Sequence, residues 1–327
     1  MESSHKILKL LADGDFHSGE ELGELLGVSR AAVWKQLKKL GEIGVHVESI
    51  KGRGYCIEGG MDLLSQDAIT KSLSDQAKTL CSVLECHWSI PSTNAHLLDF
   101  DRGQPASGRV CLAEMQTAGR GRRGRSWVSP FAANLYLSVQ WGFSGGVAQV
   151  EGLSLAVGLA LVKALECHGV KELQLKWPND VLWDDKKLAG VLLEVVGDPT
   201  GMCYVVIGVG VNVAMRLDDA EDIDQAWVNA EAAAGKVVSR NALVATFLNE
   251  LLPLLEGFGE RGFTAYADEW MRYDCFRDQP VSVVAVGNKT DGVARGVSAT
   301  GALLLEDLST GSIKQVHGGE VSLRLRS

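Results

Sequence analysis

The most unusual stretch of this 327-residue chain is AGRGRRGRSW, residues 118–127, which places four arginines among three glycines. Guanidinium groups bind phosphate or carboxylate through paired hydrogen bonds, and a glycine-rich backbone lets its NH groups approach an anion closely. The letters from Gly119 to Gly124 also fit the dinucleotide pattern G-x-G-x-x-G. That pattern needs a helix to follow, whereas Pro130 and a strand-like run follow here. The stretch predicts a ligand loop, a second DNA contact or a solvated basic loop, and its residue types alone leave these open.

Two further segments carry residues that suit an anionic ligand. Lys187 stands at the start of a long apolar run, where a lysine is costly to bury unless it meets an anion. Asn179 and Asp180 follow a proline that ends a predicted strand, a frequent place for site residues. The triplet STN, residues 92–94, either caps a helix or hydrogen-bonds a small polar ligand. Together these segments favour the ligand loop.

Residues 1–62 have the pattern of a winged helix-turn-helix domain. Apolar residues at helical spacing predict three helices, the second after Ser18 and the third after Ser29, and a hairpin turns at 51–54. Residues 29–53 carry six basic and two acidic residues, whereas residues 1–28 carry two lysines and six carboxylates. This polarity indicates that the third helix and the wing face DNA, although a helical interaction module with a solvated basic face would have the same charges.

The rest of the chain divides into two further predicted domains. Residues 63–272 mix predicted strands and helices, which indicates a central α/β domain. Residues 273–327 contain short β-like runs with turn signals about every ten residues, typical of a small β-barrel. The acidic segment Met215–Ala226 lacks helical periodicity and is predicted to be a mobile loop.

Composition limits the classes of protein. The formal net charge is -9, so any binding of DNA or phosphate must come from local basic clusters. No apolar run reaches the roughly 18 residues of a membrane span, and the first residues lack the features of a signal peptide, which predicts a cytoplasmic protein without a membrane partner. The seven cysteines are scattered and form no C-x-x-C, which predicts reduced thiols rather than disulfides or a zinc site.

The order of the motifs resembles a known family. STN, QTAGRGRRGRSW, KWPND, KKLAG and GVGVNV follow a winged helix, and HGGEVSLR lies near the end of the chain. In this order they are similar to the bacterial biotin protein ligases that also repress the biotin operon. The resemblance covers essentially the whole chain and implies an α+β multidomain protein. Its central domain would be like those of class II aminoacyl-tRNA synthetases and biotin/lipoate ligases, and an SH3-like β-barrel would follow.

The activity implied by the resemblance has two steps. Biotin and ATP form biotinyl-5′-AMP and pyrophosphate, and the biotinyl group then passes to a lysine of the biotin carboxyl carrier protein of acetyl-CoA carboxylase. The first step brings two anions together, so positive charge must offset their repulsion. The resemblance assigns this role to Lys187, Arg122 and Mg²⁺. The positions that it implies for binding biotin are Ser92, Thr93, Asn94, Gln116, Gly119, Arg120, Gly121, Arg122 and Lys187.

The resemblance also implies a nucleotide site. Asn212 would meet the adenine edge and Trp227 would cover its face, while Trp127 would lie beside the tail or nucleotide or simply in the core. Asp180 would be a Mg²⁺ ligand, and Met215–Ala226 would fold over the adenylate as a lid. The full set of nucleotide positions is Arg122, Arg125, Trp127, Asn179, Asp180, Lys187, Asn212 and Trp227.

In this family biotinyl-5′-AMP is also the corepressor. Holding it would promote a homodimer that presents two winged helices to a palindromic operator. The residues expected to contact DNA are Ser29, Arg30, Lys35, Lys38, Lys39, Lys51 and Arg53. Two alternatives are a repressor that senses a small molecule without catalysis and a lipoate-type ligase. Lys187 and two anion-binding segments disfavour the first, and the N-terminal domain with GRGRRGR disfavours the second.

Overall fold

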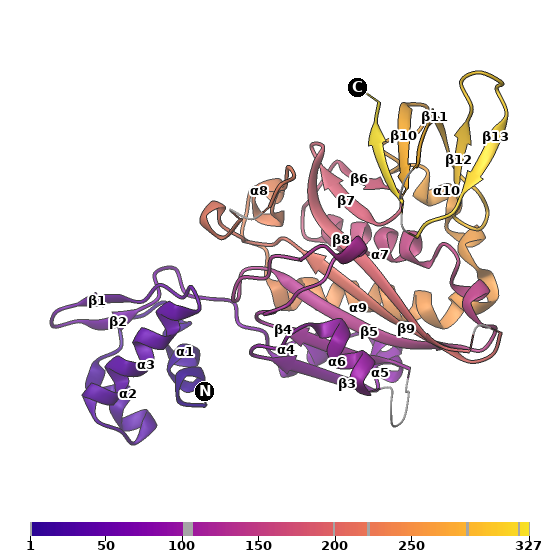
Figure 1. Ribbon diagram of the computed structural model, residues 1–327. Helices are drawn as coiled ribbons and strands as arrows, with labels where there is room; N and C mark the ends of the chain where they lie inside the picture. Colours follow the sequence, from indigo (N-terminus) through magenta and orange to yellow (C-terminus); the bar gives the residue numbers. More distant parts are fainter. Residues whose placement is uncertain are drawn as a thin grey trace.

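The computed structural model describes residues 2–100, 107–198, 200–220, 223–285, 288–319 and 321–326. Figure 1 shows the N-terminal helices and hairpin to one side of a large mixed sheet, with a smaller sheet at the other end. The predicted α+β multidomain order is confirmed.

The N-terminal part has the predicted winged helix-turn-helix order. Ser18 and Glu21 form a capping box at the start of the second helix, and Ser29 caps the third by accepting the Ala32 NH. Between these helices Gly27 has φ 64°, a left-handed conformation that suits glycine and ends the second helix in a tight turn. The elements are α1 (Glu2–Leu11), α2 (Gly19–Leu26), α3 (Arg30–Glu42), β1 (Glu48–Ile50) and β2 (Gly54–Cys56).

The central part is built on a seven-stranded sheet of order β3-β4-β5-β9-β8-β7-β6, in which only the β3–β4 pair is parallel. The prediction missed β3, because its five residues show no long apolar or alternating run. The strands are β3 (Val83–His87), β4 (Arg109–Ala113), β5 (Leu135–Phe143), β6 (Leu173–Lys176), β7 (Asp180–Trp183), β8 (Lys186–Gly197) and β9 (Cys203–Val211).

Helices cover the two faces of this sheet unequally. On β9, Ile207 and Val209 point into the main core beneath α7 and α9, whereas Gly208 points to the opposite face, where α6 packs. By length and composition α9 alone among the described helices could cross a membrane, but it packs against α7, α4 and α5 as a core helix. The helices are α4 (Gln66–Ser72), α5 (Asp75–Leu80), α6 (Thr93–Phe100), α7 (Leu153–Cys167), α8 (Ala230–Ala234), α9 (Arg240–Arg261) and α10 (Ala267–Trp270), with 3₁₀ turns Arg122–Gly124, Val147–Val150, Leu217–Ala220 and Phe263–Ala265.

The C-terminal part is a five-stranded antiparallel sheet of order β13-β12-β11-β10-β14. It confirms the predicted all-β part. Among the described residues β13 and β14 are its edges and are not paired with each other. The strands are β10 (Pro280–Ala285), β11 (Asn288–Val297), β12 (Leu303–Glu306), β13 (Ile313–Val316) and β14 (Ser322–Leu325).

A buried ion pair fastens the segment between the first two parts to the central sheet. Arg240 Nη1 lies 2.8 Å from Glu114 Oε2, and both side chains are almost fully buried. The carboxylate of Asp62 accepts the Arg240 backbone NH at 2.6 Å, and the Leu64 NH donates to Glu114 Oε1 at 2.6 Å. In addition, Phe131 of the central part is buried in the core of the N-terminal part. The N-terminal and central parts therefore pack against each other and are not joined by a flexible linker alone.

Candidate functional site

A cavity of about 530 Å³ lies on the α6 face of the central sheet and collects most of the predicted ligand residues. Its floor is formed by glycines on the neighbouring strands β8 and β9. A Cβ at Gly208 would overlap the Asn94 amide, and a Cβ at Gly210 would overlap the Trp127 ring. Sequence reasoning did not give these glycines a role, although isolated glycines inside strands signal a close approach of another group.

One end of the cavity is a buried polar network around the start of α6. Thr93 donates its backbone NH to Gln116 Oε1 at 2.9 Å, and Asn94 Nδ2 donates to Glu194 Oε2 at 2.7 Å. The Ser138 hydroxyl lies 2.7 Å from Thr93 Oγ1 and 2.5 Å from Asn94 Oδ1. Buried polar groups that hold one another in place are suited to binding a small polar ligand with fixed orientation.

Sequence reasoning found part of this network. Ser92, Thr93 and Asn94 are buried. Ser92 precedes α6 and accepts the Ala95 NH, and Thr93 and Asn94 begin the helix, so the two predicted roles of cap and ligand group are compatible. Glu194 and Ser138 were not expected, because each is 44 or more residues from its partner in the chain. Only the adjacency of β5, β9 and β8 brings them together.

The arginine loop folds over this cavity without forming a helix of the dinucleotide-binding type. The Gly121 NH donates to the Arg125 carbonyl at 2.7 Å, and Arg123 has φ 60° within the short 3₁₀ turn. Arg120 Nη1 lies 3.4 Å from Glu194 Oε1, while Arg123 and Arg125 are exposed. The predicted mobility of the loop in the absence of ligand stays a prediction.

Arg122 is the most constrained arginine of the loop. Its Nη1 donates to Asn179 Oδ1 at 2.9 Å, and its Nη2 donates to the Gly319 and Val321 carbonyls. The C-terminal part therefore reaches the cavity, and residues 321–324 line it. Only the HGGEVSLR motif at 317–324 pointed to this contribution in the sequence.

Lys187 and Trp127 stand at the middle of the site. Lys187 Nζ forms an ion pair with Asp180 Oδ1 at 2.8 Å and lies 5.4 Å from the centre of the Trp127 ring. Lys187 therefore has a carboxylate partner within the protein itself, and its predicted contact with a ligand anion stays a prediction. The indole NH of Trp127 is buried without a hydrogen-bond acceptor among the described residues, so it is a donor still to be used.

A second cavity of about 370 Å³ adjoins the first and shares Trp127 and Lys187 with it. Asn212 and Trp227 line it, as does Asp224 of the acidic segment. The Asn212 amide donates to the carbonyls of Lys187 and Val228 at 3.3 Å each. Residues 221 and 222 of the proposed lid lie outside the described residues. The two cavities suit an elongated ligand with a polar end, an anionic centre and a flat ring.

The predicted DNA-facing residues lie on α3, at its N-cap and in the turn of the wing. Ser29 caps α3, and Arg53 stacks over the Phe16 ring at 4.0 Å. Trp34, which is 56% exposed next to Lys38 on α3, was not predicted to contact DNA. All seven predicted side chains are exposed: Ser29, Arg30, Lys35, Lys38, Lys39, Lys51 and Arg53.

Comparisons with known proteins match all three parts. Models of the biotin/lipoate A/B protein ligase family, an HTH domain and the biotin protein ligase C-terminal domain match residues 87–212, 4–56 and 278–324. The bifunctional ligase/repressor BirA of Salmonella typhimurium is 42% identical over 97% of this chain and 96% of that protein, and that of Escherichia coli is 41% identical over 98% and 96%. The biotin protein ligase from Aquifex aeolicus in complex with biotin and ATP has a TM-score of 0.64 at 28% identity, covering 75% of this chain and 100% of that one.

Proposed function

The chain belongs to the bifunctional ligase/repressor family of biotin protein ligases, and on that premise we propose which ligand each of its two cavities binds. The polar cavity binds biotin, and the adjoining cavity binds the adenosine of ATP. The observation that carries this proposal is the position of Lys187 and Trp127 in the walls of both cavities. The ligand formed between them is biotinyl-5′-AMP.

The network at the start of α6 fits the ureido head of biotin. Thr93, Asn94 and Gln116 offer donors and acceptors that are already fixed by hydrogen bonds within the network, so little conformational entropy is lost on binding. Gly119 also belongs here: a Cβ at this position would approach the Gln116 amide and the Ser129 hydroxyl, so only glycine allows the backbone to pass. The valeryl chain would then run toward Lys187. The remaining positions proposed to bind biotin are Ser92, Arg120, Gly121 and Arg122.

Lys187 and Arg122 offset the charge of the first step. In that step a carboxylate oxygen of biotin attacks the α-phosphorus of ATP, and pyrophosphate leaves. Lys187 exchanges its ion pair with Asp180 for the carboxylate and α-phosphate as negative charge builds up. Arg122 is fixed by Asn179 and by the C-terminal part, so its guanidinium needs little reorganisation.

The second cavity fits the nucleotide. Trp227 provides an aromatic face for adenine, Asn212 lies at the ring edge, and Arg125 at the mouth provides a cation for the phosphates. The Trp127 indole NH provides a donor at the junction of the cavities. We propose that Met215–Ala226 closes over this nucleotide as a lid.

Mg²⁺ is proposed to bind beside the phosphates. Mg²⁺ prefers one or two carboxylates together with phosphate oxygens. Asp180 fits this preference, because its carboxylate lines the cavity and becomes available as an oxygen ligand when Lys187 turns to the substrate. Bound Mg²⁺ would neutralise charge on the pyrophosphate that leaves. Asn179 lies next to it and holds Arg122.

In the second step the amine of a carrier-protein lysine attacks the biotinyl carbonyl, and AMP leaves. The carrier is proposed to be the biotin carboxyl carrier protein of acetyl-CoA carboxylase. No described side chain in the cavity stands out as a general base for that amine. In this step the cavity therefore positions the adenylate and stabilises the negative charge of the AMP that leaves.

The adenylate also serves as corepressor in this proposal. When it is bound, the chain forms a homodimer that places two α3 helices on a palindromic biotin operator. The proposed domain boundaries are 1–62, 63–272 and 273–327. A cytoplasmic location without a membrane partner stays a prediction.

Biotin-dependent exchange of radiolabelled pyrophosphate into ATP tests the enzymatic proposal. Lys187→Ala should reduce the exchange rate about 100- to 1,000-fold, the cost of removing one preorganised charge from a transition state. Lys186→Ala is the matched control, since this neighbour pairs with Asp184 at the surface and should leave exchange unchanged. Near-normal exchange by the Lys187 variant would refute its role. Exchange with lipoate instead of biotin would favour a lipoate-type ligase, and no exchange with either would favour a sensor without catalysis.

A further inference from the structure

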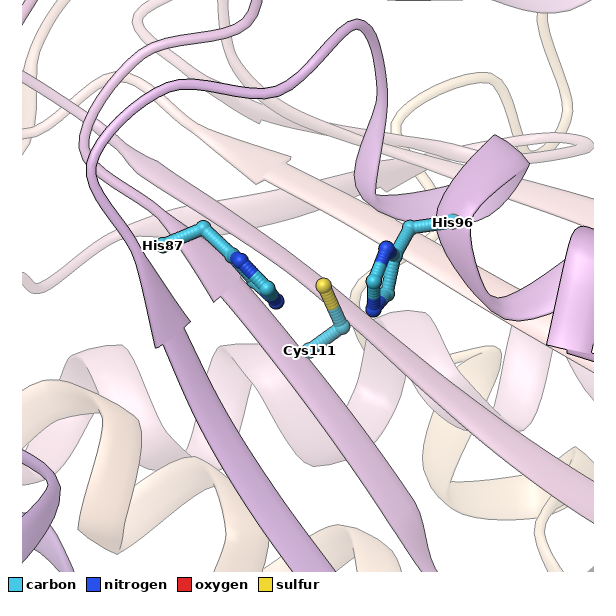
Figure 2. Close-up of side chains that lie close together, drawn as sticks. All are labelled: His87, His96 and Cys111. Atoms are coloured by element: carbon cyan, nitrogen blue, oxygen red, sulfur yellow. The ribbon is translucent and has the colours of Figure 1, made fainter.

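Two histidines and a cysteine converge away from the proposed ligase cavities. One ligand atom from each of His87, His96 and Cys111 lies within 4.8 Å of the others. Figure 2 shows the Cys111 sulfur between the two imidazole rings, whose centroids are 4.5 Å apart. The sequence showed no metal pattern, because the three residues come from three separate elements.

The fold explains why these side chains meet. Cys111 on β4 is the register partner of Glu85 on β3, so the two point to the same face of the sheet. His87 lies two residues beyond Glu85 and shares that face. Helix α6 covers this face and supplies His96, whose Nε2 lies 3.1 Å from Glu85 Oε2. Four groups able to bind or orient a metal ion therefore occupy one small space.

We propose that His87, His96 and Cys111 bind a transition-metal ion, Zn²⁺ being the best match. Zn²⁺ prefers imidazole and thiolate ligands, and its bond lengths place tetrahedral ligand atoms about 3.3–3.6 Å apart. The spacing of at most 4.8 Å requires only a small inward movement of the side chains. The metal would keep a fourth position for water or for Glu85.

Glu85 and the burial of the cluster support this site. Glu85 Oε2 lies 3.1 Å from His96 Nε2 and 3.8 Å from His87 Nε2. In many zinc sites a carboxylate holds one ring nitrogen of a histidine in this way while the other nitrogen binds the metal. His87 Nε2 is buried without a hydrogen-bond partner among the described residues, and a small rotation of the ring would bring it to Glu85 and leave Nδ1 for the metal.

A second chemistry for these residue types is covalent catalysis by a Cys–His–Glu set. One observation excludes it. Cys111 has 0% exposure, so a substrate cannot reach its sulfur. A metal ion is much smaller than a substrate, and the two histidine side chains, which are 26–29% exposed, give it an entry.

The metal would link β3, β4 and α6 at one point. Helix α6 begins with Thr93 and Asn94, which belong to the polar network of the first cavity. A bound ion would therefore stabilise the position of that network as well as the local fold. This consequence is separate from the ligase proposal, since metal binding itself is measured without substrates.

Titration of the full chain with Co²⁺ after treatment with a chelator tests the proposal. We expect one equivalent to bind and to show the visible bands of tetrahedral Co²⁺ with a near-ultraviolet thiolate-to-cobalt band. Zn²⁺ should remove both, and it should raise the Tm. Cys111→Ser should abolish the thiolate band, while Glu85→Gln should weaken binding about 10- to 100-fold, as loss of an orienting partner does elsewhere.

Cys86→Ser is the matched control. Cys86 lies on the same strand between Glu85 and His87 but points to the other face of the sheet, against the main core, so its loss should leave the Co²⁺ spectrum unchanged. If Cys111→Ser does not fold, His87→Asn and His96→Asn replace it, because both are partly exposed and should each lower the affinity at least as much as Glu85→Gln. An unchanged spectrum in these variants, or binding well below one equivalent to the unmodified chain, would overturn the site.

Discussion

At Gly208, on the cavity floor, a single added methyl group should weaken biotin binding and leave ATP binding nearly unchanged. A Cβ added there would overlap the side-chain amide of Asn94, which is 3% exposed. Asn94 cannot swing away without cost, because it is hydrogen-bonded on both sides. Gly208→Ala should therefore break the polar network and leave the second cavity intact.

The size of the effect follows from the two hydrogen bonds at risk. Asn94 Oδ1 accepts from Ser138 at 2.5 Å, and Asn94 Nδ2 donates to the Glu194 carboxylate at 2.7 Å. A neutral bond contributes about 1 kcal/mol and one to a charged group about 1.5–3, so roughly 2–4 kcal/mol is lost in total. Folding and ligand binding share this loss. A share of about 1.4–2.8 kcal/mol in binding corresponds to a 10- to 100-fold rise in the KM for biotin.

Pyrophosphate exchange at varied biotin and fixed saturating ATP measures this shift, and the converse titration measures the KM for ATP, which should change less than about 3-fold. Gly158→Ala is the matched control. Its Cβ would meet only the Leu175 side chain, at 3.3 Å and outside both cavities, so it should leave the KM for biotin unchanged.

The double variant Gly208→Ala/Asn94→Ala provides the refutation. Truncating Asn94 makes room for the new methyl group, so the double variant should be no worse than Asn94→Ala alone, a clear departure from additivity. Additive losses, or an equal rise in KM for both substrates, would refute the assignment of this network to biotin.

Three further predictions concern stability and DNA. Arg240→Met leaves the Glu114 carboxylate buried without its partner, so urea denaturation should show a free energy of unfolding lower by about 3–5 kcal/mol; exposed Arg261→Met is the control, and equal effects would contradict the reasoning. Burial raises the pKa of Asp274 to about 6, so its protonation stabilises the fold as pH falls. Relative to Asp274→Asn, the unmodified chain should gain about 1–1.5 kcal/mol between pH 7 and pH 5, and a loss would refute this. Lys38→Ala should weaken operator binding and lower the slope of log K against log[salt] by about 0.9 if Lys38 meets one phosphate; an unchanged slope would exclude that contact.

The sequence alone determined the N-terminal part and the family. Helix α3 and the turn before it depend on local features, namely the Ser18 and Ser29 caps, the left-handed Gly27 and apolar residues at helical spacing. Such signals act over a few residues, so they can be read without knowing the rest of the fold. The motifs around the arginine loop and Lys187 were equally visible, because their residue types are unusual wherever they stand.

The tertiary structure alone decided which residues face one another. Period-two alternation tells that two residues share a face of a strand, but not which strand is its neighbour. The order β5-β9-β8 is not the order of the chain, and it is what brings Ser138 and Glu194 to Asn94 and makes a floor of glycines. In the same way, Cys111 lies beside His87 because β3 pairs with β4 in parallel. The sequence did not reveal β3. Long-range strand order sets these sites, because it depends on the packing of the whole sheet rather than on any local run of residues.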